Sequence, residues 1–295
     1  MKIAILNDQI PETYLGGAAL VNDKIKKEFE SKGHICNIII ANEKNDIQNI
    51  DEVIDTYDYF IFANIGYVGS ENLNKIMDSK PFITFRHDIP VILYTQPPSE
   101  RFKLFYDTWG RMFKEAKMTY FISEMQASVF KQTFKVTHET ILPPPLDIDN
   151  FKNEKREDRN GCLYVGDISN ARGCQETFQL MQQLHPDMQK TFVGEIIDGE
   201  LADVLKQHGA KVLPAIDHSE MNELMNSNKY LFYFPNIYDS FCLKILEAEL
   251  AGMIIYADRF RIGRYSYTQQ AEELRTHMNK ISLKNIVSTV LQNDC

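Results

Sequence analysis

The feature that most constrains the fold is a regular alternation of short apolar runs with longer amphipathic stretches. Between the first two runs, Ala18, Val21, Ile25 and Phe29 recur at helical spacing, which predicts a helix with one buried face. The apolar runs predict buried strands at Lys2–Leu6, Ile35–Ala41, Tyr59–Ala63, Pro81–Phe85, Met118–Ile122, Thr140–Leu142, Cys162–Val165, Thr191–Val193, Lys211–Leu213, Tyr230–Phe234 and Met253–Tyr256. Alternation of this kind is typical of an α/β protein with parallel sheets covered by helices on both faces.

One polar segment divides this pattern into two halves. Residues 152–161 are highly charged and have no apolar period, so we expect a linker or hinge there. The expected domains are an N-terminal Rossmann-like domain at 1–151 and a C-terminal one at 162–295, which fits a length of 295 residues at roughly 150 per domain. Two doubly wound domains of this type should face one another across a cleft, with ligands at the carboxyl ends of the strands.

Composition excludes several classes of protein. A net charge of −9 argues against a protein that coats nucleic acid through bulk charge, although local basic patches are compatible with it. Five cysteines without a CxxC pair exclude a disulfide framework and a zinc ribbon, and scattered histidines give no metal site. No apolar run approaches the ~20 residues of a membrane span, so we expect a cytoplasmic protein without an integral membrane segment.

The first strand is followed by Gly16 and Gly17, which open the first helix. Glycines here would allow a ligand to approach the backbone, and the helix start would offer N–H groups to an anion. The pattern is not GxGxxG and no acidic residue ends the second strand, so a dinucleotide site is excluded. A plain flexible turn is the alternative interpretation.

The richest motif runs from Tyr238 to Gly252 and predicts a helix over 241–251. Asp239 or Ser240 would cap this helix and Gly252 would end it. Asp239 at the loop mouth could hold sugar hydroxyls, and Glu247, eight residues later, could bind a ribose diol. The helix start between them suits a diphosphate. An amphipathic core helix with two solvated acids is the alternative.

This segment resembles the acid-x7-acid signature of the retaining nucleotide-sugar glycosyltransferases of family 4, which have the two-Rossmann GT-B fold. Other matches follow in the family's order: Gly16-Gly17 with the helix ending Ser31–His34, Ile122-Ser123-Glu124, Ile141–Phe151, Leu163–Gly166 with Arg172-Gly173, Phe192–Gly194 and Tyr233–Pro235. The resemblance covers nearly the whole chain. It implies metal-independent transfer of a sugar from a nucleotide diphosphate sugar, the co-substrate, with no cofactor and with retention of anomeric configuration.

The resemblance also assigns roles to individual residues. It implies that Asp239 holds the transferred sugar, that Glu247 holds the ribose and that Arg172 binds the diphosphate. The remaining donor-binding candidates, at the matched loops, are Gly16, Gly17, Gly166, Ser240, Phe241, Cys242 and Leu243. Because no carboxylate is placed to act as a nucleophile, the resemblance implies front-face attack assisted by the departing phosphate.

Several positions depart from the family pattern. Where the family has Arg-x4-Lys, this chain has Asp167 and Arg172, which replaces one cation by an acid. An uncompensated carboxylate beside a diphosphate would cost ~1–4 kcal/mol. Arg259, Arg261 and Arg264, in the loop after the last strand, could supply the missing charge, and a solvated basic loop is the alternative.

The N-terminal half offers a second group of candidates. His87, which follows an apolar strand, resembles the histidine near the transferred sugar in many family members, and a structural histidine is the alternative. Arg86 beside it and Trp109, in the aromatic and basic stretch 101–111, could contact an acceptor. At helical spacing, a core-facing stripe is the favoured interpretation of Trp109.

The sequence therefore predicts a glycosyltransferase, of the hexosyl or pentosyl type, whose hydroxyl acceptor is not identified. An Asn-, Lys- and Ile-rich composition indicates an AT-rich genome, such as that of a phage or a low-GC bacterium. For a phage enzyme, one alternative is transfer to a hydroxymethylated DNA base in the host cytoplasm. A degenerate, non-catalytic nucleotide-binding protein of the same fold is the second alternative, favoured by Asp167 and Cys242.

Overall fold

The computed structural model describes residues 1–7, 17–41, 47, 49–90, 93, 102–145, 148–258, 260–263 and 282–292. The chain forms two compact units, the first built on residues 1–146 and the second on residues 147–263. All eleven strands expected from the sequence are present in the described residues, each to within one residue at either end.

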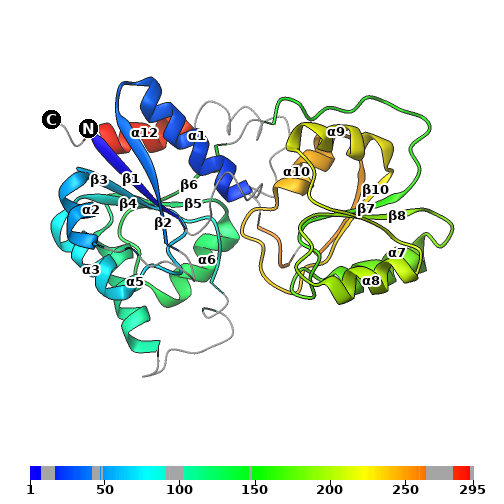
Figure 1. Cartoon of the computed structure of the whole chain (residues 1–295), viewed down its shortest axis with the longest axis horizontal. Helices are drawn as coiled ribbons and strands as arrows, with labels where there is room; N and C mark the ends of the chain where they lie inside the picture. The colour runs from blue at the N-terminus through cyan, green and yellow to red at the C-terminus, as the bar shows by residue number, and fades with distance from the viewer. Residues whose placement is uncertain are drawn as a thin grey trace. The chain divides into compact units, whose positions relative to one another are not determined.

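The first unit is a six-stranded parallel sheet with the order β2-β1-β3-β4-β5-β6. The strands are β1 (Lys2–Asn7), β2 (Ile35–Ile40), β3 (Tyr59–Phe62), β4 (Phe82–Phe85), β5 (Thr119–Phe121) and β6 (Glu139–Ile141). The helices are α1 (Gly17–Ser31), α2 (Ile50–Thr56), α3 (Ser70–Ser79), α5 (Lys103–Glu115), α6 (Glu124–Thr133) and α12 (Leu283–Leu291). Figure 1 shows α1 and α12 on one face of this sheet and α2, α3 and α5 on the other.

Burial on both faces explains the continuous apolar strands of this sheet. All residues of β3 and β4 are buried, as expected of parallel strands covered by helices on both sides. Helix α1 buries Val21, Ile25 and Phe29, which confirms the apolar stripe expected from their spacing.

Helix α12 belongs to the first unit, although the sequence pattern assigned 162–295 to a C-terminal domain. It packs against α1 and buries Ile286, Val287 and Val290. The Tyr120 hydroxyl, at the middle of β5, lies 2.6 Å from Thr289 Oγ1 and donates to the carbonyl oxygen of Asn285 at 3.2 Å. An apolar helical face does not specify its partner sheet, so local pattern could not reveal this return.

The second unit is a five-stranded parallel sheet with the order β11-β10-β7-β8-β9, a Rossmann-type order. Its strands are β7 (Cys162–Val165), β8 (Lys190–Val193), β9 (Lys211–Leu213), β10 (Tyr230–Tyr233) and β11 (Ile254–Ala257). Its helices are α7 (Cys174–Leu184), α8 (Gly199–Gln207), α9 (His218–Ser227) and α10 (Leu243–Leu250). In Figure 1, α7 and α8 cover one face of this sheet, and α9 and α10 cover the other.

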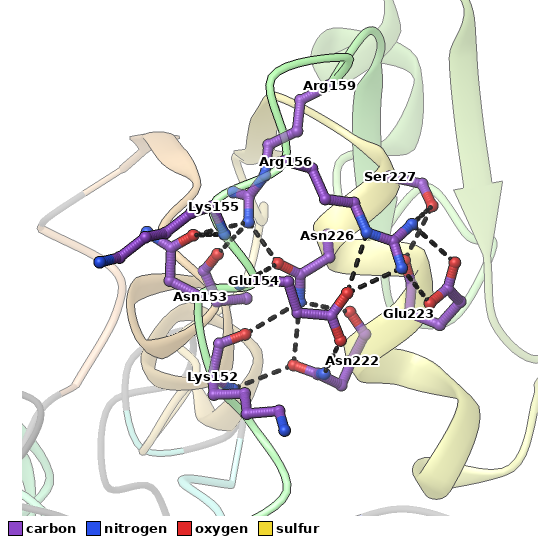
Figure 2. Close-up of polar contacts among 11 residues, drawn as sticks. Lys152, Asn153, Glu154, Lys155, Arg156, Arg159, Asn222, Glu223, Asn226 and Ser227 are labelled. Atoms are coloured by element: carbon purple, nitrogen blue, oxygen red, sulfur yellow. Dashed lines mark hydrogen bonds and ion pairs between the residues drawn. The ribbon is translucent and has the colours of Figure 1, made fainter.

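Residues 152–161, expected as a hinge, are bonded along their length to the second unit (Figure 2). The guanidinium of Arg156 contacts Glu154 at 2.7 Å and donates to Glu223 of α9 at 2.8 Å. Asn226, fully buried, accepts from the backbone N–H of Glu154 and from Arg159, and donates to the carbonyl oxygen of Lys152. Three charged side chains of this segment, Glu154, Arg156 and Arg159, are therefore paired with polar side chains of α9.

Candidate functional site

Most of the candidate donor residues lie in the second unit, near the carboxyl ends of β7 and β10. In the strand order these two neighbours mark the point where the chain reverses direction across the sheet. Loops that leave a parallel sheet at such a switch point run to opposite faces and open a crevice between them, which is where doubly wound sheets bind ligands. Residues 166–173 follow β7, and residues 234–242 follow β10.

Gly173 holds these two loops together. It adopts a left-handed conformation (φ +66°), and a Cβ at this position would lie 1.8 Å from the carbonyl oxygen of Phe234. Only glycine allows the start of α7 to lie this close to the loop after β10. Because Arg172 directly precedes Gly173, this contact also fixes the position of Arg172.

Arg172 lies between two carboxylates. Its Nε is 3.5 Å from Asp167 Oδ2, and its Nη1 is 3.8 Å from Asp239 Oδ2. Burial alone would lower the pKa of Arg172, but Tyr233, Asp239 and Asp167 outweigh it and raise the pKa above its ordinary value. The acid that replaces a family cation, Asp167, is therefore paired with the cation that the chain retains.

Asp239 is positioned by both its side chain and its backbone. Tyr233, at the end of β10, donates its hydroxyl to Asp239 Oδ2 at 2.9 Å, and burial raises the pKa of that phenol well above its usual value. The Asp239 N–H donates to the carbonyl oxygen of Arg261 at 2.8 Å, and its carbonyl oxygen accepts from the N–H of Gly263 at 2.7 Å. The loop after β11 thus lies beside this acid.

The structure adds one cation that the sequence did not single out. Lys244, in the first turn of α10, places its Nζ 3.7 Å from Asp239 Oδ2 and 3.8 Å from the centre of the Tyr233 ring. The same ammonium is 3.1 Å from the point that a Cβ at Gly166 would occupy. In the sequence, Lys244 is one polar residue of an amphipathic helix, and only the fold shows that it faces Asp239.

Glu247, the second acid of the motif, is buried in the second turn of α10 and has a specific partner. His218, the first residue of α9, places its Nε2 2.7 Å from Glu247 Oε1, and the side chain of Glu247 is only 6% exposed. A solvated acid on a core helix is therefore excluded. His218 was not predicted, because it lies 29 residues away and no local pattern connects the two.

The start of α10 differs from the expected cap. The helix begins at Leu243 with Cys242 at the N-cap position and without a side-chain cap bond, so neither Asp239 nor Ser240 caps it. Ser240 and Cys242 are buried, and burial raises the pKa of the Cys242 thiol, which stays protonated. Phe241 and Leu243 are half-buried at the same helix start. Gly252 ends the helix with φ +77°, as expected.

The basic loop after β11 is described in part. The guanidinium of Arg261 donates to the carbonyl oxygen of Pro235 at 3.1 Å and lies 3.8 Å from Asp258. Its nearest acid is thus Asp258, whereas Asp167 is paired with Arg172. Three predicted site residues lie outside the described part of the chain: Gly16, Arg259 and Arg264.

In the first unit, His87 follows β4 and is held by a residue of α1. Its Nε2 lies 2.9 Å from Oδ1 of Asn22, which is fully buried, so Nε2 carries the proton and donates to the amide oxygen. Burial, with a further contribution from the charge of Arg86, lowers the pKa of His87 to about 3. The imidazole is therefore neutral, and Nδ1 is its acceptor atom. Gly17, the first residue of α1, belongs to the same unit.

Arg86 and Trp109 lie in the core of the first unit, which for Trp109 is the favoured interpretation of its helical spacing. Trp109 is 2% exposed and packs against Phe105, Phe113, Phe130 and Phe134. Arg86 is fully buried, lies 4.7 Å above the Trp109 ring, and donates to Asp88 and to the carbonyl oxygen of Ala63. The aromatic stripe at helical spacing is therefore a helix face packed into the core, which is the more common case.

Within the described residues, no three His, Cys, Asp or Glu side chains are grouped as a metal site would require. The helices that the structure describes include none with both the length and the apolar character needed to cross a bilayer.

Comparison with known proteins shows the GT-B fold. No family model and no curated protein sequence matches the chain. Among solved structures, HepE from Anabaena in complex with UDP-glucose aligns with a TM-score of 0.66 at 16% identity, over 100% of this chain and 97% of HepE. Sucrose-phosphate synthase from Thermosynechococcus elongatus gives 0.69 at 10% identity, over 99% of this chain and 97% of the synthase. A glycosyltransferase from Rickettsia africae gives 0.61 at 15% identity, over 99% and 93% of the two chains.

Proposed function

We propose that this protein is a glycosyltransferase that moves a sugar from a nucleoside diphosphate sugar to a hydroxyl acceptor, with retention of anomeric configuration. The observation that carries the proposal is the grouping of Arg172 and Asp239 at the switch point of the second sheet, with Glu247 buried in the second turn of α10. The GT-B fold supports it, because a protein of similar structure, HepE, was solved with UDP-glucose bound.

In this proposal the roles follow from charge and position. Glu247, held through one oxygen by His218, binds the ribose, and Asp239 binds sugar hydroxyls. Arg172 and the start of α10 take the diphosphate, since guanidinium groups and helix N-termini both favour phosphate. Gly166 and residues 240–243 line the same donor site.

The reaction proceeds by attack of the acceptor hydroxyl on the anomeric carbon from the side that the diphosphate leaves. The departing phosphate oxygen takes the hydroxyl proton, so no protein carboxylate forms a bond to the sugar. The largest contribution of the protein is electrostatic stabilisation of the leaving diphosphate. His87, neutral and fixed by Asn22, offers Nδ1 as a hydrogen-bond acceptor to a sugar or acceptor hydroxyl.

The test is a thermal-shift panel of UDP, GDP and ADP, followed by assays of slow hydrolysis with the corresponding nucleotide sugars. At 100 times its Kd, the correct nucleotide stabilises the folded protein by about 2.7 kcal/mol, which shifts Tm by several degrees. Early NMR spectra of the released sugar should show the anomer of the donor. If none of the three nucleotides shifts Tm, the proposal fails.

Two substitutions refine the test. Arg172→Ala should weaken donor binding at least ~10-fold, because it removes a charged partner of the diphosphate. Arg261→Ala should have a smaller effect, since its guanidinium is engaged by Pro235 and Asp258. An equal loss for both variants would place the diphosphate beside the loop after β11 instead.

A further inference from the structure

Two cations at the candidate donor site share one carboxylate oxygen without bonding tightly to it. Lys244 Nζ and Arg172 Nη1 lie 3.7 Å and 3.8 Å from Asp239 Oδ2. Their side chains are only 16% and 28% exposed. In the part of the chain that the structure describes, neither side chain donates a hydrogen bond to another residue.

This arrangement is unfavourable unless a ligand completes it. An ammonium carries three N–H donors and a guanidinium five, and charged donors lose the most when they are removed from water without partners. A purely structural ion pair would be expected to close to hydrogen-bond distance, as Tyr233 does with the same Asp239 oxygen at 2.9 Å. The two cations therefore have donors left for an anion larger than a single carboxylate.

The charge balance of the cluster of Arg172, Lys244, Asp167 and Asp239 also indicates an anionic ligand. Arg172 and Lys244 are opposed by Asp167 and Asp239, so the four charges cancel. Without Lys244 the cluster would be net negative and would repel a diphosphate. Lys244 is also held in place, over the Tyr233 ring and against the backbone of Gly166, where no side chain intervenes.

We infer that Lys244 is the second diphosphate-binding cation of this protein and that Asp239 is its counter-ion when no donor is bound. When a nucleoside diphosphate binds, its phosphate oxygens take the N–H donors of Lys244 and Arg172. Asp239 Oδ2 is then released from both cations and becomes available to the sugar hydroxyls. This inference rests on the proposed function, and it assigns to Lys244 the charge that Asp167 leaves missing.

The experiment measures Kd by calorimetry for UDP and for uridine, which lacks the phosphates, with wild-type protein and four variants. If the nucleotide panel selects GDP or ADP, that nucleotide and its nucleoside replace UDP and uridine. Lys244→Met should weaken UDP binding about 10-fold or more and leave uridine binding unchanged, because only the diphosphate contact is lost. Lys244→Arg should restore most of the affinity. Asp239→Asn should tighten UDP binding several-fold, since the cations lose their competing carboxylate.

Lys229→Met is the matched control. Lys229 lies on the same unit and is also placed over an aromatic ring, 5.4 Å from the centre of Tyr230. Tyr230 begins β10, at the opposite edge of the sheet from Tyr233, so this variant removes the same charge away from the site. Its UDP affinity should equal that of the wild type.

Three results would overturn the inference. The first is that Lys244→Met binds UDP as tightly as the wild type. The second is that Lys244→Met loses UDP and uridine affinity equally, as a structural role predicts. The third is that Asp239→Asn weakens UDP binding. If Lys244→Met does not fold, Lys244→Gln serves in its place. If wild-type protein binds none of UDP, GDP and ADP, the proposed function itself fails; if it binds one and Lys244→Met binds it equally well, only the role of Lys244 fails.

Discussion

The neutral state of His87 predicts a specific loss of stability in acid. The pKa of this imidazole is about 3 in the folded protein and 6.5 in an ordinary environment. Between these values the unfolded chain binds a proton that the folded chain excludes, so stability is complete above pH 6.5 and falls as the pH is lowered. Because pH 5 lies 1.5 units below the pKa of this imidazole in the unfolded chain, the stability lost at pH 5 is at most about 2 kcal/mol.

Replacing His87 by Gln removes this contribution. The free energy of unfolding of the wild type, minus that of His87→Gln, should decrease by about 2 kcal/mol from pH 7 to pH 5. The only tryptophan of the chain, Trp109, is buried in the same unit beneath Arg86, so its fluorescence during urea unfolding reports the unit that contains His87.

His138→Gln is the control, because this histidine is exposed in the same unit. The free energy of unfolding of His138→Gln should change with pH in the same way as that of the wild type. Parallel stability curves for the wild type and His87→Gln between pH 7 and pH 5 would refute the conclusion that the fold keeps His87 neutral.

Three further predictions test the architecture. Gly173→Ala should destabilise the second unit by roughly 3 kcal/mol or more, because the new Cβ would overlap the carbonyl of Phe234. The control Gly33→Ala, at a glycine with open space around it, should cost only about 1 kcal/mol. Similar losses of Tm for the two variants would contradict the close contact at Gly173. Asn226→Ala should cost about 2–4 kcal/mol in chemical unfolding and expose residues 152–161 to protease, since it leaves buried backbone groups unpaired; unchanged proteolysis would show that the segment is held otherwise. Tyr120→Phe should cost about 1 kcal/mol and speed amide exchange in α12, whose carbonyl and hydroxyl groups lose a partner; unaltered exchange would refute the anchoring role.

The candidate site was predictable where its chemistry is local in the chain. Asp239 and Glu247 belong to one motif of a single loop and helix, so their spacing singled them out. Arg172, in one loop after a strand, was assigned by the resemblance to the family. His218 and Lys244 escaped prediction for a different reason. Their roles depend on contacts with Glu247 and Asp239, which form only when α9, α10 and the loop after β7 pack on the same sheet.

The same distinction applies to Trp109 in the first unit. Helical spacing placed Trp109 on a helix, but spacing does not say whether an aromatic stripe faces a ligand or the core. The packing of Phe113 and Phe130 against Trp109, with Arg86 above it, decided for the core.

The sequence by itself determined the α/β class and all eleven described strands, because apolar periodicity and turn residues act over a few neighbouring residues. Only the tertiary structure decided the order of the strands, the return of α12 to the first sheet and the attachment of residues 152–161 to α9. It also decided which cation faces which acid. These features are set by pairing between residues far apart in the chain, where strand partners, burial and charge are chosen by the whole fold.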